Sequence, residues 1–462
     1  MRRIALIVLL VVIAGCGERA QPKKVPTTDV MTPIEDALGP LRVSAANPRY
    51  FESPTGKIVY LTGSYTWNAL QDWGATNPPR AITFNGYVDF LVAYGHNFTR
   101  LVPWEQRSGV PWTTEPVWMT PLPYERTGTD AGLDGQPKFD LTKWDEAYFD
   151  RLRSRIRHAA RRGVYVSVVL FNGLSLGRNA WKGHPFNGAN NVNHVDGDAN
   201  RNGEGEELET LANTAVTARQ YAYVDKVIAS IGDLENVIWE VGNEPLPTST
   251  AWQQAIAQHL AETERARGTI HPVVGESVVF ETQPLWSDRT NESWVWRTFL
   301  EGRQPILLDP YRTQVVDGAP VFRDAAADAQ LPPRDLSRPE WWPIRKNLGY
   351  TRWLASRMDL KEMKPQPSLA STGYCLAAPG RDYLIYVPAL EGAGRVTSLF
   401  GLLPRTVRVD LSASGGLFAT EWFDPSTALL VSGPQIQGGS SRRVSSPFGN
   451  GAAVLRVWLF SL

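Results

Sequence analysis

Cysteine is almost absent from this sequence, and so is any excess of charge of one sign. Two cysteines occur among 462 residues, Cys16 and Cys375, and 47 Lys and Arg balance 47 Asp and Glu. If Cys16 is acylated, as argued below, no disulfide within the chain remains. Without a basic cluster, the chain also lacks the electrostatic footprint of a nucleic-acid-binding protein. We therefore expect neither a disulfide framework nor a nucleic-acid partner.

Two motifs of common enzyme classes are missing as well. The sequence contains no His-Glu-x-x-His zinc motif and no glycine-rich phosphate loop after its first apolar strand. These absences argue against a zinc protease and a nucleotide-binding sheet. What remains is a globular chain, 43% apolar and 20% charged, that is long enough for a large domain and a smaller one.

Residues 1–16 have the features of a bacterial lipoprotein signal. Arg2 and Arg3 precede an apolar run over residues 4–14 that is too short to span a membrane. The run ends in IAGC, which resembles a lipobox, so we predict that Cys16 carries a lipid at the bacterial cell envelope. Residues 17–40 are rich in Pro, Thr and charge and are predicted to be a tether. An ordinary signal peptide with a chance cysteine is the alternative.

Residues 41–363 alternate between apolar strands and amphipathic helices, which is typical of βα units around a parallel sheet. Strands are expected at 58–62, 97–103, 164–171, 236–241 and 305–309, and a helix at 340–363. The missing phosphate loop favours a TIM-type (β/α)8 barrel over an open doubly wound sheet. Only 60 residues separate Glu244 from Pro305, whereas three βα units need roughly 90. We therefore expect a barrel shortened by one or two βα units.

The remainder, residues 366–462, is predicted to be an all-β sandwich. It follows the chain-breaking KPQP segment and contains short strand-like runs separated by Gly, Pro and Ser. The expected strands are 383–387, 406–411, 418–423 and 453–460.

The strongest catalytic candidate is Glu244, which follows an apolar strand in the segment VIWEVGNEP. Reactive groups of β/α barrels lie at the carboxyl ends of strands. A Glu there can protonate a glycosidic oxygen, and the neighbouring Asn243 can hold a sugar hydroxyl. The alternative is a carboxylate that caps the turn after the strand.

A retaining glycosidase needs a second carboxylate about 5–5.5 Å from the first. Glu281 is the preferred candidate because it follows the apolar run VVF, while Glu276 and Asp309 are the other candidates. Arg100 ends the second strand and can keep a carboxylate ionised, or form a structural ion pair.

Other polar or aromatic residues near strand ends are assigned to substrate binding, with burial in the core or in loops as the alternative. They are Trp67, Trp104, Trp181, His184, Asp309 and Tyr311. A separate loop, DANRNG, has the oxygen spacing of a calcium site, with Asp198, Asn200, Asn202 and Glu209 as ligands. A structural calcium is therefore predicted, with a solvated acidic loop as the alternative.

Several of these segments together resemble a known family. The stretches PLRV to NPRYF, YLTGSYTWN, HPFN, GNE, WVW and DPY resemble a cellulase-like (β/α)8-barrel glycoside hydrolase family of exported bacterial proteins. The tail segments STGYC and EWFDP are similar to a sandwich domain that bears a collagen-binding name in the same architecture. The resemblance implies a retaining mechanism, with Glu244 at the fourth strand and a nucleophile near the seventh. Relatives often carry Asp-Thr-Asp-His where this chain has ETQP at 281–284.

The sequence thus predicts a retaining glycoside hydrolase that cleaves a β-linked glycan at the cell envelope and requires no cofactor. The alternative is a lapsed barrel that binds carbohydrate or matrix protein. A third reading is a chain shortened by deletion, with a poorly stable product.

Overall fold

The computed structural model describes most of the chain in nine segments. They are residues 23–24, 39–274, 278–285, 287–309, 311, 314–316, 319–321, 341–390 and 405–460. The predicted lipidation site Cys16 and the candidate Glu276 lie outside the described residues. None of the helices in these segments is long and apolar enough to cross a membrane.

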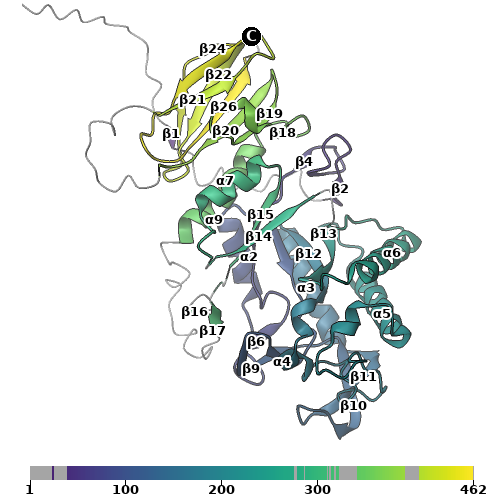
Figure 1. Ribbon diagram of the computed structural model, residues 1–462. Helices are drawn as coiled ribbons and strands as arrows, with labels where there is room; N and C mark the ends of the chain where they lie inside the picture. Colours follow the sequence, from purple (N-terminus) through teal and green to yellow (C-terminus); the bar gives the residue numbers. More distant parts are fainter. Residues whose placement is uncertain are drawn as a thin grey trace, which may run out of the picture.

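The centre of the larger region is a curled, six-stranded parallel sheet (Figure 1). Its strands, in spatial order, are β13 (Val237–Asn243), β12 (Tyr165–Asn172), β7 (Phe98–Leu101), β5 (Gly63–Tyr65), β15 (Gln304–Leu308) and β14 (Phe280–Pro284). β7, β12 and β15 are buried along their whole length, as expected for a sheet covered by helices outside and filled by side chains inside; β12 and β15 are mostly apolar, whereas β7 includes Thr99 and Arg100. The strands predicted at 97–103, 164–171, 236–241 and 305–309 are confirmed. The strand predicted at 58–62 is displaced, because Ile58–Val59 form β4 of a small antiparallel sheet and the parallel strand β5 begins at Gly63.

The sheet is shorter than a complete barrel, as the residue spacing predicted. After β13 the chain forms α6 (Thr250–Arg267) and then makes a single parallel bridge between Val273 and Trp239. Only six residues separate Val273 from Phe280, the first residue of β14. Because a βα unit needs at least about 30 residues, there is no room here for a further strand and helix.

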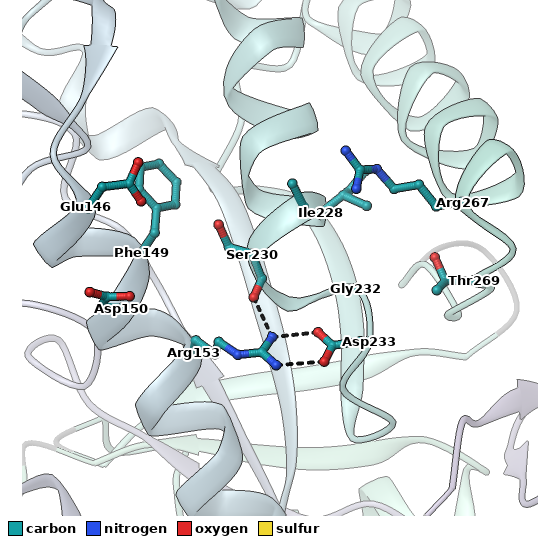
Figure 2. Close-up of a pocket in the computed structure, with 11 residues that line it drawn as sticks. Glu146, Phe149, Asp150, Arg153, Ile228, Ser230, Gly232, Asp233, Arg267 and Thr269 are labelled. Atoms are coloured by element: carbon teal, nitrogen blue, oxygen red, sulfur yellow. Dashed lines mark hydrogen bonds and ion pairs between the residues drawn. The ribbon is translucent and has the colours of Figure 1, made fainter.

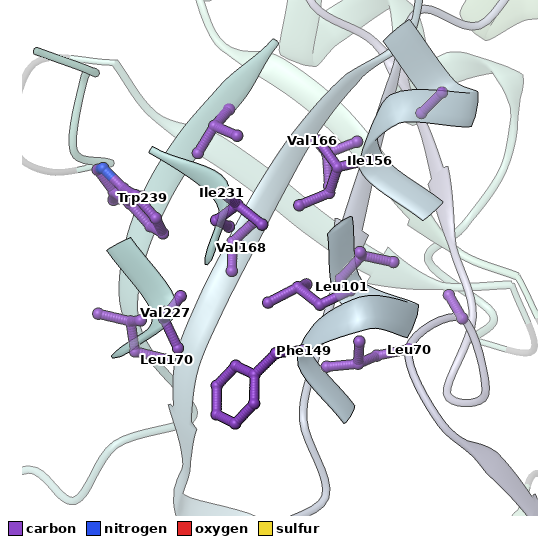
Figure 3. Close-up of a cluster of buried hydrophobic side chains, with 14 of the residues drawn as sticks. Leu70, Leu101, Phe149, Ile156, Val166, Val168, Leu170, Val227, Ile231 and Trp239 are labelled. Atoms are coloured by element: carbon purple, nitrogen blue, oxygen red, sulfur yellow. The ribbon is translucent and has the colours of Figure 1, made fainter. Parts of the chain in front are cut away.

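Amphipathic helices cover the outer face of the sheet. They are α2 (Phe84–Ala93), α3 (Glu146–Arg161), α5 (Thr214–Ile231) and α6. Figure 3 shows side chains of α3 and α5, such as Ile156 and Ile231, packed against Val166 and Val168 of β12. The helix starts are capped: Asp145 accepts the amide of Ala147, and Asn213 those of Ala215 and Val216.

Two further helices, α7 (Glu292–Leu300) and α9 (Trp342–Ala355), lie between the parallel sheet and the C-terminal β region (Figure 1). Their aromatic residues share one core with that region: Trp296 stacks on Tyr386 at 6.3 Å, and Trp353 packs against Phe423. The interface is therefore built like a protein interior.

The C-terminal region is antiparallel, with the path β1–β23–β22–β26–β20–β19–β18, β24 beside β22, and a separate β21–β25 pair. The bounds are β18 (Lys364–Pro365), β19 (Cys375–Ala378), β20 (Asp382–Val387), β21 (Thr406–Asp410), β22 (Leu417–Phe423), β23 (Leu429–Ser432), β24 (Ile436–Gln437), β25 (Ser441–Ser445) and β26 (Ala453–Leu459). β1 (Lys23–Lys24), within the predicted tether, pairs with β23. Cys375 is buried, as expected, and burial raises its pKa to about 12.

The remaining strands and helical turns lie outside the six-stranded parallel sheet. The strands are β2 (Arg42–Val43), β3 (Phe51–Glu52), β4 (Ile58–Val59), β6 (Asp72–Gly74), β8 (Ser108–Val110), β9 (Thr113–Thr120), β10 (Tyr124–Ala131), β11 (Pro137–Trp144), β16 (Gln314–Val316) and β17 (Ala319–Val321). The helical turns are η2 (Gly173–Ser175), α4 (Arg178–Trp181), η3 (Glu206–Glu209) and η6 (Pro367–Leu369).

Candidate active site

Glu244 lies directly beyond β13, exposed at the carboxyl edge of the parallel sheet. Its φ is +47°, in the left-handed region that a non-glycine residue adopts at a cost of about 1–3 kcal/mol. Its carbonyl oxygen lies against Gly173, where a Cβ atom would approach it to 2.2 Å. The close contact with Gly173 therefore restricts the backbone conformation of Glu244 at the end of β13.

An ion pair fills the sheet interior below Glu244. Arg100 donates from Nε to Glu240 Oε2 at 3.0 Å and from Nη2 to Glu240 Oε1 at 2.5 Å. Ser167 donates to the same carboxylate at 3.0 Å. Burial disfavours the guanidinium, but Glu240 more than offsets this, and the pKa of Arg100 is raised. Of the two predicted roles of Arg100, the structural ion pair is therefore present.

The side chain of Asn243 is fixed from both ends. Its Oδ1 accepts from Arg100 Nη2 at 3.2 Å, and its Nδ2 donates to Asn172 Oδ1 at 3.1 Å. Asn172 ends the neighbouring strand β12 and is paired in register with Asn243. Asn243 is thus pre-oriented beside Glu244, as expected for a residue that holds a sugar hydroxyl.

The structure does not bring Glu281 to Glu244. In β14 the preceding residue Phe280 faces the interior, where its ring packs on Phe98 at 4.6 Å. Glu281 points to the opposite face: its carboxylate accepts from Trp294 Nε1 at 2.8 Å and from Arg303 Nη1 at 2.9 Å. Because successive strand residues alternate in direction, the predicted nucleophile faces α7.

Asp309 and Tyr311 are structural rather than exposed to substrate. Asp309 forms a bidentate ion pair with Arg345 of α9, both contacts at 2.7 Å, and is fully buried. Tyr311 is buried against Tyr87 and Phe90. Neither residue is placed as the predictions required.

The three predicted tryptophan platforms belong to the core. Trp67 and Trp104 are buried with Trp73 in one aromatic cluster, in which Trp73 stacks on Trp104 at 5.5 Å. Trp181 is buried against His184, with ring centroids 5.0 Å apart. Their indole faces are therefore covered by protein, and the alternative reading of core tryptophans is correct.

The predicted calcium ligands do not converge. Both oxygens of Asp198 accept backbone amides of the loop, Oδ1 from Asn202 and Oδ2 from Gly203, while Asn200 also accepts from Asn202. Glu209 turns away and accepts the amide of Leu246 at 2.6 Å. Within the described segments, no three His, Cys, Asp or Glu side chains are grouped to hold a metal. The loop is shaped by its own Asx turns.

Two carboxylates that the sequence did not single out as catalytic lie near the exits of β12 and β13. Glu105 accepts the amide of Asn172 at 2.7 Å and is 17% exposed. Glu209 is buried beneath the turn that follows Glu244, and burial, with the nearby charge of Glu105, raises its pKa to about 7. Glu105 comes from the loop after β7 and Glu209 from the helical turn η3. Their contacts lie 67 and 37 residues away in the sequence, so residue spacing gave no signal.

Residues 173–177 read GLSLG and match the Gly-x-Ser-x-Gly pattern of serine hydrolases. Ser175 is nevertheless fully buried in η2, with no positive φ, and its hydroxyl accepts the amide of Glu105 at 3.2 Å. The strained, exposed turn that presents such a nucleophile is absent here.

A hollow of about 540 Å³ lies away from these strand exits, among the outer helices α3, α5 and α6. Figure 2 shows Arg153 across it in a bidentate pair with Asp233, with Arg267 on the opposite wall. None of the predicted site residues lines this hollow.

Comparison with solved structures places this architecture. One protein described as a glycoside hydrolase is 14% identical, with 93% of this chain and 98% of that chain covered and a TM-score of 0.55. A family 5 glycoside hydrolase from Bacteroides vulgatus ATCC 8482 is 13% identical. The alignment covers 92% of this chain and 94% of that chain, and the TM-score is 0.58. The fold of this chain is therefore similar to that of these two proteins.

At the level of sequence, residues 111–279 match a family described as a domain of unknown function (DUF6298). This segment contains Asn243 and Glu244 but neither Arg100 nor Glu281. No curated protein matches the chain.

Proposed function

We propose that this protein is a glycoside hydrolase that cleaves a β-linked glycan with Glu244 as general acid/base. The observation that carries the proposal is the exit of β13. There an exposed Glu244 follows an asparagine whose amide is fixed by Arg100 and Asn172. The similarity in fold to glycoside hydrolases supports the same chemistry. A carboxylic acid beside an amide suits a carbohydrate, because the acid can protonate a glycosidic oxygen and the amide can bind a sugar hydroxyl.

In the retaining reaction Glu244 acts twice. First it donates its proton to the glycosidic oxygen as the bond to the anomeric carbon breaks. The sugar is then bound covalently to the second carboxylate. A water molecule attacks the anomeric carbon and releases the sugar, and Glu244 removes a proton from that water. Asn243 needs no reorganisation to bind a sugar hydroxyl, since its amide orientation is already set in the free protein.

We further propose that the protein acts outside the cytoplasm as an envelope lipoprotein. This rests on the signal-like residues 1–14 and on Cys16. Metabolic labelling with a radioactive fatty acid, compared between the wild type and Cys16→Ser, tests it: incorporation should be lost in the variant.

A second candidate function is a lapsed barrel that retains glycans without cleaving them. The direction of Glu281 favours this second function. The resemblance places the nucleophile on this strand, but the carboxylate of Glu281 points out of the sheet interior, toward Trp294 and Arg303. The lapsed barrel predicts carbohydrate binding that survives Glu244→Gln.

The deciding experiment is hydrolysis of a panel of aryl β-glycosides and plant or bacterial polysaccharides. Glu244→Gln should reduce turnover by about 10²–10⁴-fold, the usual contribution of a general acid. Glu281→Gln is the matched control and should leave turnover within a few fold, since its carboxylate faces α7. Turnover unchanged in Glu244→Gln contradicts the assignment, and a folded wild type that binds glycans without turnover favours the lapsed barrel.

A further inference from the structure

The carboxylate of Glu244 takes its direction from the backbone that carries it. The side chain is exposed, and within the described segments it makes no hydrogen bond or ion pair. Its φ of +47° and the contact of its carbonyl oxygen with Gly173 set the direction in which the side chain leaves the end of β13. A group that holds the turn after Glu244 therefore also holds the carboxylate.

Glu209 of η3 lies against this turn. Its Oε2 accepts the amide of Leu246, two residues after Glu244, at 2.6 Å. Its Oε1 lies 3.4 Å from the position that a Cβ atom on Gly173 would take, and the carbonyl oxygen of Glu244 lies 2.2 Å from the same position. Because Glu209 is only 3% exposed, bulk water does not compete for these contacts.

The hydrogens around Ser249 indicate that Glu209 is itself a donor. The carboxyl group of Glu209 also interacts with Ser249, the residue before α6. Ser249 donates its one hydroxyl hydrogen to the carbonyl oxygen of Leu246 at 2.7 Å, and its oxygen accepts from Gln253 at 2.8 Å. A hydrogen between Glu209 and Ser249 therefore comes from the carboxyl group. This agrees with the pKa of Glu209, which burial and the charge of Glu105 raise to about 7.

We propose that Glu209 is a positioning residue for Glu244, an inference that rests on the proposed function. Through Leu246 and Ser249 it closes the turn between β13 and α6, and this turn fixes the place of the Glu244 carboxyl group at the edge of the sheet. Glu209 is buried, so it acts through Glu244 and not on the substrate. A general acid has to stand within hydrogen-bond reach of the glycosidic oxygen, so a turn that is free to move lowers kcat.

The kinetics of a variant pair test this role. Glu209→Met fills the same space without either hydrogen bond and should lower kcat by about 10²-fold, with KM little changed. The conservative Glu209→Gln keeps an acceptor for Leu246 and a donor for Ser249, so it should restore kcat to within a few fold of the wild type. Glu206→Met, at an exposed position of the same helical turn, is the control. Equal losses in Glu209→Met and Glu209→Gln, or a loss in neither, overturn the proposal.

Hydrogen exchange reports on the turn without any substrate. Deuterium uptake by the peptide of residues 243–252, followed by mass spectrometry, should be about tenfold faster in Glu209→Met than in the wild type and in Glu209→Gln. Uptake by residues 405–460 should be the same in all three proteins, which distinguishes a loosened turn from general unfolding. A loss of kcat without faster exchange in the 243–252 peptide overturns the proposal, because the effect then does not pass through the turn.

Should Glu209→Met fail to fold, Glu209→Asp replaces it, because the shorter side chain withdraws the carboxyl group from Leu246. A wild type that turns over no substrate overturns the proposed function, and the exchange comparison still decides whether Glu209 holds the turn. A wild type with normal turnover, together with a Glu209→Met variant that equals it in kcat and in exchange, overturns this inference alone.

Discussion

Asp309, the residue after the last strand of the parallel sheet, forms a bidentate ion pair with Arg345 of α9, and their side chains are 0% and 1% exposed. The guanidinium also lies 5.0 Å from the ring of Phe90 on α2. One cation thus joins the end of β15 to helices that come from opposite ends of the larger region. Asp309 was a candidate for catalysis, but its location makes it a structural anchor.

Arg345→Met should lower the free energy of unfolding by about 3–5 kcal/mol, because it leaves the Asp309 carboxylate buried without its partner. Urea denaturation measures the loss. Arg303→Ala is the control: its pair with Glu281 has side chains 48% and 25% exposed, so the expected cost is at most about 1 kcal/mol. Equal costs for the two variants would show that the buried pair is not the anchor inferred here.

Gly173→Ala should displace the turn that carries Glu244. The new Cβ would lie 2.2 Å from the carbonyl oxygen of Glu244, which has to move, so we expect a loss of about 1–3 kcal/mol in stability together with reduced turnover. Gly177→Ala, four residues later, meets nothing closer than 3.9 Å and should behave like the wild type. Unfolding midpoints and turnover of both variants, measured side by side, decide the matter.

Glu209 should make stability depend on pH. Its pKa is raised from 4.5 to about 7, so the folded chain retains a proton that the unfolded chain loses above pH 4.5. Stability therefore falls between about pH 4.5 and 7, by an amount on the order of 3 kcal/mol. Glu209→Gln removes this cost and should gain stability over the wild type across that window.

Glu206→Gln, which changes an exposed side chain on the same turn, is the control for the pH series. A difference between Glu209→Gln and the wild type that stays constant from pH 4 to pH 8 would contradict the expected titration.

Phe423→Ala should destabilise the whole chain rather than the C-terminal region alone. Phe423 on β22 packs against Trp296 of α7 and Trp353 of α9, and its truncation should cost about 3–5 kcal/mol. Leu417→Ala, on an exposed position of the same strand, should cost far less. Calorimetry should show a single shifted transition for Phe423→Ala; two separate transitions would mean that the two regions unfold independently.

Four of the strands of the parallel sheet could be predicted because they are apolar runs between amphipathic helices, whereas the helix predicted at 340–363 ends at Ala355. The shortening after Glu244 was equally visible, since residue counts limit how many βα units fit. The strand pairing of Lys23 and Lys24 was not visible, because two charged residues in a polar segment carry no strand pattern.

The site was predicted less completely, for physical reasons that differ between residues. Val278, Val279 and Phe280 are all apolar, so no alternation indicates which face of β14 Glu281 takes. The calcium spacing at Asp198 is also the spacing of successive Asx turns, which use the same oxygens. Glu105 meets Asn172 only through the fold, whereas the exit of β13 could be predicted because strand and polar residue are adjacent in sequence.

The pairing of β5 with β15 has a consequence for the order in which the chain folds. Gly63 pairs with Ile306, and Thr62 donates to Pro305 across a separation of 243 residues. Contacts of such high sequence separation form late, because a long loop must close before any of them is made. Until β15 has been synthesised, one edge of β5 has no partner, so a chain that stops before residue 304 should be prone to aggregation.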